Sequence, residues 1–79
     1  SVEQNKIKMY PNPIKDILVI ESSQVIKTAT IFNLTGEKMV NYEVNAKQKT
    51  LDISSLSSGI YFIHFNNTGK LQQAKIVKL

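Results

Sequence analysis

Gly59-Ile60-Tyr61-Phe62-Ile63-His64-Phe65 is the stretch that decides the fold of this 79-residue chain. It is rich in β-branched and aromatic residues, which favour strands over helices. Because side chains alternate between the two faces of a strand, every second residue from Tyr61 to Phe65 is predicted to point into a core. Ile60 and Phe62 then point away from the core, so this strand is predicted to be apolar on both faces.

The rest of the chain repeats this pattern of short apolar runs separated by turn residues about every eight to twelve positions. Such spacing is typical of an antiparallel β-sandwich or barrel, and no stretch has a convincing helical face. The sequence therefore predicts an all-β domain of about seven strands. These strands are expected near residues 7–10, 15–21, 25–33, 37–44, 50–53, 60–66 and 70–78.

Three connections carry recognisable turn chemistry. Asn33-Leu34-Thr35-Gly36 and Asn66-Asn67-Thr68-Gly69 each end in a glycine that allows positive φ, and both predict hairpins. The serine-rich segment 54–59 is too long for a tight hairpin and is expected to cross from one sheet to the other. Leu56 is its one large apolar residue, and we expect it to cap an open end of the core.

Tyr10-Pro11-Asn12-Pro13 marks the entry into the fold. The two prolines lock φ and remove backbone donors, so no central strand can run through this segment. It is expected to act as a rigid entry point, or simply as a strand break that protects a sheet edge. Upstream of it the sequence is polar, and we expect residues 1–8 to be a linker from an upstream part of the protein and residues 9–79 to form the domain. Because the first residue is Ser1, the chain is expected to be a piece of a longer protein.

Composition argues against several classes of function. The net charge of +4 comes from scattered lysines without any arginine, which disfavours nucleic-acid binding. No apolar run approaches the roughly 20 residues of a membrane-spanning helix, so no membrane insertion is expected. His64 is the only histidine and cysteine is absent, so we predict no catalytic residues, no metal site and no cofactor. The chain is therefore not expected to be an enzyme.

Apolar side chains on both faces recur in two further strands, at Ile17-Leu18-Val19-Ile20 and at Ile76-Val77. In a two-layer sandwich one face of each strand meets solvent, so some apolar surface should be exposed. Contiguous apolar patches on a small protein usually mark a docking surface. The alternative is that loops or the missing part of a parent protein cover them.

Together these landmarks resemble the type A C-terminal sorting domain of the type IX (Por) secretion system of Gram-negative bacteria. The resemblance covers roughly residues 9–79. The motifs that carry it are Tyr10-Pro11-Asn12-Pro13, the stretch from Ile31 through Gly36 to Val40, the stretch from Leu51 through Leu56 and Gly59 to Tyr61, and Lys75-Ile76-Val77-Lys78-Leu79.

The resemblance implies an immunoglobulin-like antiparallel β-sandwich at the C-terminus of a cargo protein. Such a domain would direct its cargo from the periplasm through the outer-membrane translocon to the cell surface or the medium. A sortase-like peptidase would remove it in the linker before Tyr10 and attach or release the cargo. By the same analogy Lys75, Ile76, Val77, Lys78 and Leu79 carry the recognition signal, and Gly59 and Tyr61 shape the sheet behind it.

A physical route fits this role. The last strand could add to a sheet edge of a receptor, with Lys75 and Lys78 meeting acidic rims, and deletion of residues 75–79 is expected to leave a folded domain that is no longer exported. The alternative function is an immunoglobulin-like adhesion or carbohydrate-binding module, for which Tyr42 would be the exposed aromatic platform. Self-association is left open.

Overall fold

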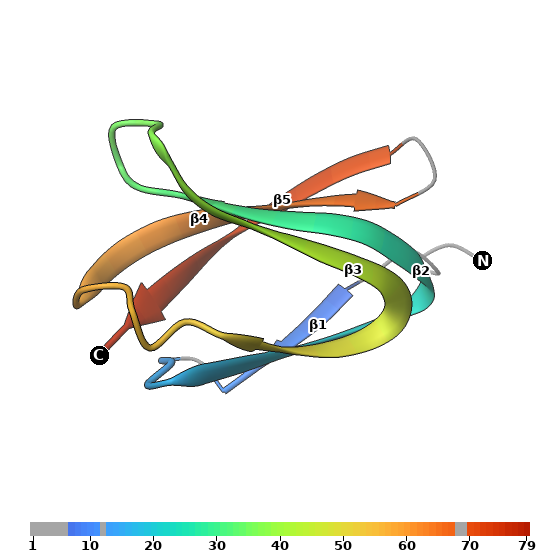
Figure 1. Ribbon diagram of the computed structural model, residues 1–79, viewed down its shortest axis with the longest axis horizontal. Coiled ribbons are helices and arrows are strands. Elements are labelled where there is room, and N and C mark those ends of the chain that lie inside the picture. Colours follow the sequence, from blue (N-terminus) through green and yellow to red (C-terminus); the bar gives the residue numbers. More distant parts are fainter. Residues whose placement is uncertain (1–6, 12, 68–69) are drawn as a thin grey trace.

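The computed structural model describes residues 7–11, 13–67 and 70–79. Five strands form a single antiparallel sheet (Figure 1). They are β1 (Ile7–Tyr10), β2 (Ile17–Phe32), β3 (Lys38–Asp52), β4 (Gly59–Asn67) and β5 (Lys70–Lys78). The order along the sheet is β1-β2-β4-β5, and β3 pairs with the other edge of β2.

The all-β, antiparallel prediction is confirmed, but the described residues form five strands instead of the predicted seven. β2 joins the strands expected at 15–21 and 25–33, and β3 joins those expected at 37–44 and 50–53. The two long strands stay paired through register shifts between Glu21 and Ile26, so the polar residues there bend the ladder without ending it. Polar composition had suggested a break, whereas pairing between β2 and β3 preserves the strands.

This bending changes the predicted architecture. The first half of β2 lies between β1 and β3, and its second half lies between β4 and β3. One sheet therefore curls into a half-barrel whose two arms face each other across the core (Figure 1). The seven-strand immunoglobulin-like sandwich predicted above is replaced by this curled sheet, because β2 and β3 pass continuously from one arm to the other.

The core lies inside the curl and is almost entirely aliphatic. The alternation predicted for β4 is confirmed, because Tyr61, Ile63 and Phe65 are buried whereas Ile60 is exposed and Phe62 is half-buried. The buried apolar residues are Ile14, Leu18, Ile20, Ile26, Ala29, Ile31, Val44, Leu51, Ile53, Leu56, Tyr61, Ile63, Phe65 and Ile76. Burial of these side chains is the main stabilising contribution, since the chain has no cysteine for a disulfide.

The predicted hairpin at Asn33–Gly36 joins β2 to β3. Gly36 has a φ of 89°, which favours glycine, and its N–H donates to the carbonyl of Asn33 over 3.0 Å. The Asn33 side-chain oxygen accepts from the backbone N–H groups of Thr35 and Glu37. The second predicted hairpin joins β4 to β5, which pair antiparallel from Asn67 and Lys70 onward, and its turn residues 68–69 lie outside the described residues.

The serine-rich segment connects β3 to β4. Its start is held by Asp52, whose carboxylate accepts from the backbone N–H of Ser54 over 3.0 Å and from its hydroxyl over 2.7 Å. These two hydrogen bonds lower the pKa of Asp52. Leu56 follows in a turn and is buried, as predicted, and its N–H donates to the carbonyl of Ile53. The segment leads directly into β4, which begins at Gly59.

Candidate recognition strand

The predicted recognition residues 75–79 form the end of β5 and the one residue after it, at the edge of the sheet. β5 pairs with β4 without interruption, from Asn67 opposite Lys70 to Gly59 opposite Lys78. Among the described strands, β4 is the only neighbour of β5. The strand is therefore held by hydrogen bonds along one side, and its other side meets no further strand.

The end of β5 has one additional backbone partner. The N–H of Ile14 donates to the carbonyl of Val77 over 2.8 Å, and the N–H of Leu79 donates to the carbonyl of Ile14 over 2.7 Å. Ile14 thus forms a parallel bridge opposite Lys78, and its own side chain is fully buried. This bridge, which we call the Ile14 clamp, ties the connection between β1 and β2 to the last strand. The sequence contains no sign of this bridge, because an isolated bridge leaves no periodic signal.

The five predicted recognition residues divide between two faces. Ile76 is fully buried, and Lys78 is only 7% exposed, with its Nζ donating to the carbonyl oxygen of Leu79 over 3.2 Å. Lys75 is exposed, Val77 is half-buried and Leu79 is 60% exposed. A partner that approaches the folded domain therefore meets Lys75, Val77 and Leu79 and cannot readily reach Ile76 or Lys78.

This division argues against the prediction that residues 75–79 could be deleted from a folded domain. Deletion would remove the buried side chain of Ile76 and both hydrogen bonds of the Ile14 clamp. Loss of one large buried aliphatic side chain alone costs about 2–5 kcal/mol, which is a large part of the stability of a small domain. Single substitutions on the outer face are the cleaner way to test recognition.

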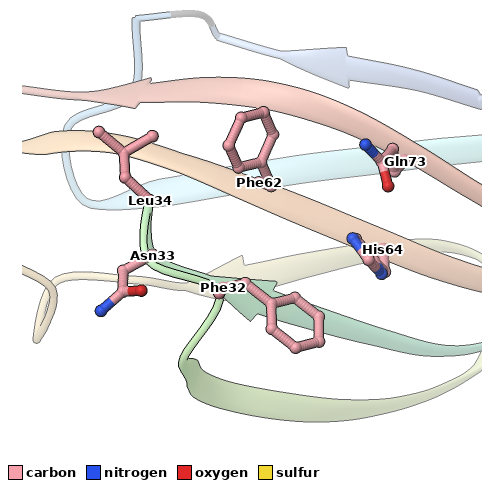
Figure 2. Close-up of a pocket in the computed structure, with 7 residues that line it drawn as sticks. Phe32, Asn33, Leu34, Phe62, His64 and Gln73 are labelled. Carbon is pink, nitrogen blue, oxygen red and sulfur yellow. The ribbon is translucent and has the colours of Figure 1, made fainter.

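The outer face of β4 and its neighbours carries a hollow of about 270 Å³. Figure 2 shows Phe62 and His64 from β4, Phe32 from the end of β2 and Gln73 from β5, with Leu34 from the turn at one end. The rings of Phe32 and His64 lie 4.5 Å apart between centroids at an angle of 45°. Phe62 and His64 share a face by strand alternation, whereas Phe32 joins them only because it is the register partner of Phe62.

Two of the predicted structural motif residues lie on β4, directly beside the last strand. Gly59 and Tyr61 are the register partners of Lys78 and Ile76. Gly59 has a φ of 151°, and the buried Tyr61 donates its hydroxyl to the carbonyl of Ser57 over 2.7 Å. The hydrogen bond anchors the start of β4 to the serine-rich segment.

The entry motif lies at the other side of the clamp. Tyr10 ends β1 and donates its hydroxyl to the carboxylate of Glu21, which raises the pKa of Tyr10. Pro11 and Pro13 are exposed, and Asn12 lies outside the described residues. Ile14 follows directly, so the entry motif leads the chain into the clamp.

One other predicted feature, Tyr42, has a different setting from the one expected. Tyr42 is half-buried, and its hydroxyl donates to the carbonyl of Asp52 over 2.8 Å, so it is no open aromatic platform. Burial, with the nearby charge of Asp52, raises the pKa of Tyr42. In the part of the chain that the structure describes, no three potential metal ligands gather at one place. Within the same residues there is no helix with the length and apolarity to cross a membrane.

A curled antiparallel sheet whose last strand turns Lys75, Val77 and Leu79 outward defines a small all-β domain suited to recognition. The family model described as secretion system C-terminal sorting domain matches residues 8–79, and the chain belongs to this family. Its members are non-catalytic sorting-signal domains of type IX secretion, which direct secretion toward the cell surface through interaction with the secretion machinery. The resemblance drawn from the sequence is thereby confirmed.

A solved structure supports the fold. The chain is similar to PorZ, described as an essential bacterial surface component of the type-IX secretion system of human oral-microbiomic Porphyromonas gingivalis. The TM-score is 0.70 at 16% sequence identity, and the similarity covers 92% of this chain and 11% of the PorZ chain. At this identity the similarity shows the fold alone. The chain matches none of the curated proteins at a significant level.

Proposed function

We propose that the translocon of the type IX system recognises this domain through the outer face of the end of β5. The observation that carries the proposal is the division of the last residues, with Lys75, Val77 and Leu79 outward and Ile76 and Lys78 inward. In this proposal the inward pair holds the strand in place. The outward residues make the contacts that a receptor reads.

The chemistry of the outward residues suggests the receptor surface. Val77 and Leu79 would fill shallow apolar pockets, and Lys75 would meet an acidic rim that steers the encounter. The Ile14 clamp supports this arrangement because it holds Val77 and Leu79 in extended geometry before any partner arrives. A preordered strand avoids part of the entropy cost of binding.

We extend the same proposal to the individual steps of export. Residues 1–8 link the domain to an upstream cargo protein, and residues 9–79 are the sorting domain. The domain passes through the periplasm, and a sortase-like peptidase then cuts the chain before Tyr10 and attaches or releases the cargo. The exposed Pro11 and Pro13 support a rigid entry segment at which such an enzyme could approach the linker.

A fusion experiment tests this proposal. Residues 1–79 are placed behind a fluorescent reporter that carries a periplasmic export signal, in a bacterium with an intact type IX system. Reporter outside the cell, absent in a strain without the translocon, is the expected result, and shrinkage to reporter size would add cleavage. A folded fusion that stays in the periplasm of both strains would contradict the proposal and favour an adhesion or carbohydrate-binding module.

A further inference from the structure

The edge of β5 upstream of the Ile14 clamp has unpaired backbone groups. Because the carbonyl of Val77 and the N–H of Leu79 point toward Ile14, alternation along the strand directs the N–H and C=O groups of Lys75 and Gln73 to the same side. The register between β4 and β5 is continuous, so no bulge breaks this alternation. No strand among the described residues lies beside this part of β5. Each of the two residues therefore offers one donor and one acceptor to an added strand.

The outer face beside this edge offers a contact for an aromatic side chain. Gln73 is the β5 residue that lines the hollow, and it is the register partner of His64, whereas Lys75 is the register partner of Phe62. Figure 2 shows Gln73 next to His64 at the rim of the hollow. On an added strand, the residue opposite Gln73 would be the direct cross-strand neighbour of Gln73. An aromatic residue placed there would pack on the Gln73 side chain at the rim of the hollow.

The positive charge of this region favours an acidic residue as the second side chain of the added strand. β4 and β5 contain no aspartate or glutamate, and Lys75 is exposed on the outer face. A carboxylate on the added strand, opposite Lys75, would form a cross-strand pair of opposite charge, whereas a lysine there would be repelled. The unpaired backbone groups, the rim of the hollow at Gln73 and the charge of Lys75 together describe one kind of binding partner for this edge.

We infer that the edge of β5 at Gln73 and Lys75 binds an extended strand of a partner protein that carries an acidic residue and, two positions on, an aromatic residue. The strand adds antiparallel to β5, with the acidic residue opposite Lys75 and the aromatic residue opposite Gln73. This site shares Lys75 with the residues 75–79 proposed for sorting and goes beyond that function, because it adds Gln73 and the unpaired backbone edge of β5. Ile14 limits the added strand at one end by occupying the edge at Val77 to Leu79.

The probe is the capped peptide threonine-glutamate-threonine-phenylalanine-threonine, titrated into the ¹⁵N-labelled chain and followed by NMR. We expect saturable shifts and slower amide exchange at Gln73 and Lys75. A matched peptide with N-methylated glutamate and phenylalanine amides loses the donors that face β5, and it should bind at least about tenfold more weakly. Equal affinity for the two peptides, or shifts centred on another part of the molecule, would overturn the inference.

Two variants of the same residue test the edge from the protein side. Gln73→Pro removes an N–H that faces away from β4, so the sheet keeps its hydrogen bonds, whereas Gln73→Ala keeps the N–H. Peptide affinity should fall about tenfold or more in Gln73→Pro and stay within about threefold in Gln73→Ala. Equal affinity of both variants would contradict strand addition. Shifts of Gln73 and Lys75 that grow with protein concentration alone would assign the edge to a second copy of the chain and also overturn the inference.

The peptide-binding experiments and the sorting assay test separate claims. Peptide binding at Gln73 and Lys75 with no translocon-dependent export would refute the proposed function and leave the edge inference standing. Normal export of the fusion without peptide binding would support the proposed function and refute the edge inference.

Discussion

Ile14 donates its backbone N–H to the carbonyl of Val77 over 2.8 Å and so joins the entry of the fold to the end of its last strand. The two residues are 63 positions apart, from 14 to 77, yet they belong to one bridge. Because the side chain of Ile14 is fully buried at the same point, the bridge is supported by the core. The orientation of the terminal residues therefore depends on packing at the other end of the sequence.

Ile14→Ala tests this dependence. The substitution leaves a cavity beneath the clamp, and we expect the free energy of unfolding to fall by about 2–4 kcal/mol. Urea unfolding followed by circular dichroism measures the loss. Leu34→Ala is the matched control, because Leu34 is 63% exposed and its truncation should cost about 0.5 kcal/mol or less. Equal losses for the two variants would show that the clamp has no support from the core.

The outward residues can be tested without disturbing the fold. Lys75→Glu reverses a charge on the outer face of β5, so we expect export of the reporter fusion to fall roughly tenfold, equivalent to about 1.4 kcal/mol of lost recognition. The melting temperature should hardly change, as for most surface substitutions. Lys47→Glu makes the same charge change at an exposed position of β3. If this control lowers export as much as Lys75→Glu, the effect comes from net charge and not from recognition.

Deletion of residues 75–79 should unfold the domain. It removes the buried Ile76 together with the two backbone hydrogen bonds to Ile14. Far-ultraviolet circular dichroism and thermal melting of the shortened chain are expected to show no cooperative transition. A shortened chain that melts cooperatively near the temperature of the full chain would mean that the last strand contributes little to stability.

Gly59→Ala probes the backbone where β4 begins. Gly59 has a φ of 151°, which residues with a Cβ rarely adopt, and no neighbouring atom lies within 4 Å of an added Cβ. The expected loss of about 1–3 kcal/mol is therefore backbone strain without a steric clash. Ser58→Ala, at the exposed preceding residue, is the control and should be nearly neutral. A neutral Gly59→Ala would indicate that β4 can begin in another conformation.

Asp52 gives the domain a specific pH dependence. The hydrogen bonds from Ser54 lower the pKa of Asp52 in the folded state, so the ionised carboxylate stabilises the fold. With a lowered folded pKa, this contribution is complete above the ordinary pKa of about 4 and is lost as the pH falls through the folded value. Asp52→Asn should therefore lower the melting temperature at pH 7 more than at pH 2.5. A difference that stays constant between these two pH values would exclude the carboxylate as its source.

The sequence by itself determined the parts of this protein that depend on neighbouring residues. Alternation from Tyr61 to Phe65 predicted which side chains are buried, because a strand turns successive residues to opposite faces. Gly36 predicted its hairpin, because positive φ is a property of one residue. The ordered motifs, taken together, also indicated the family.

Only the tertiary structure decided the features that depend on pairing between distant residues. β2 and β3 remain single bent strands because each supports the other through a register shift near Glu21. Lys78 is buried because the clamp and Gly59 lie on either side of it, and Phe32 joins the hollow only through its register with Phe62. Register between strands is set by the sum of many long-range contacts, and a local pattern of side chains contains no record of it.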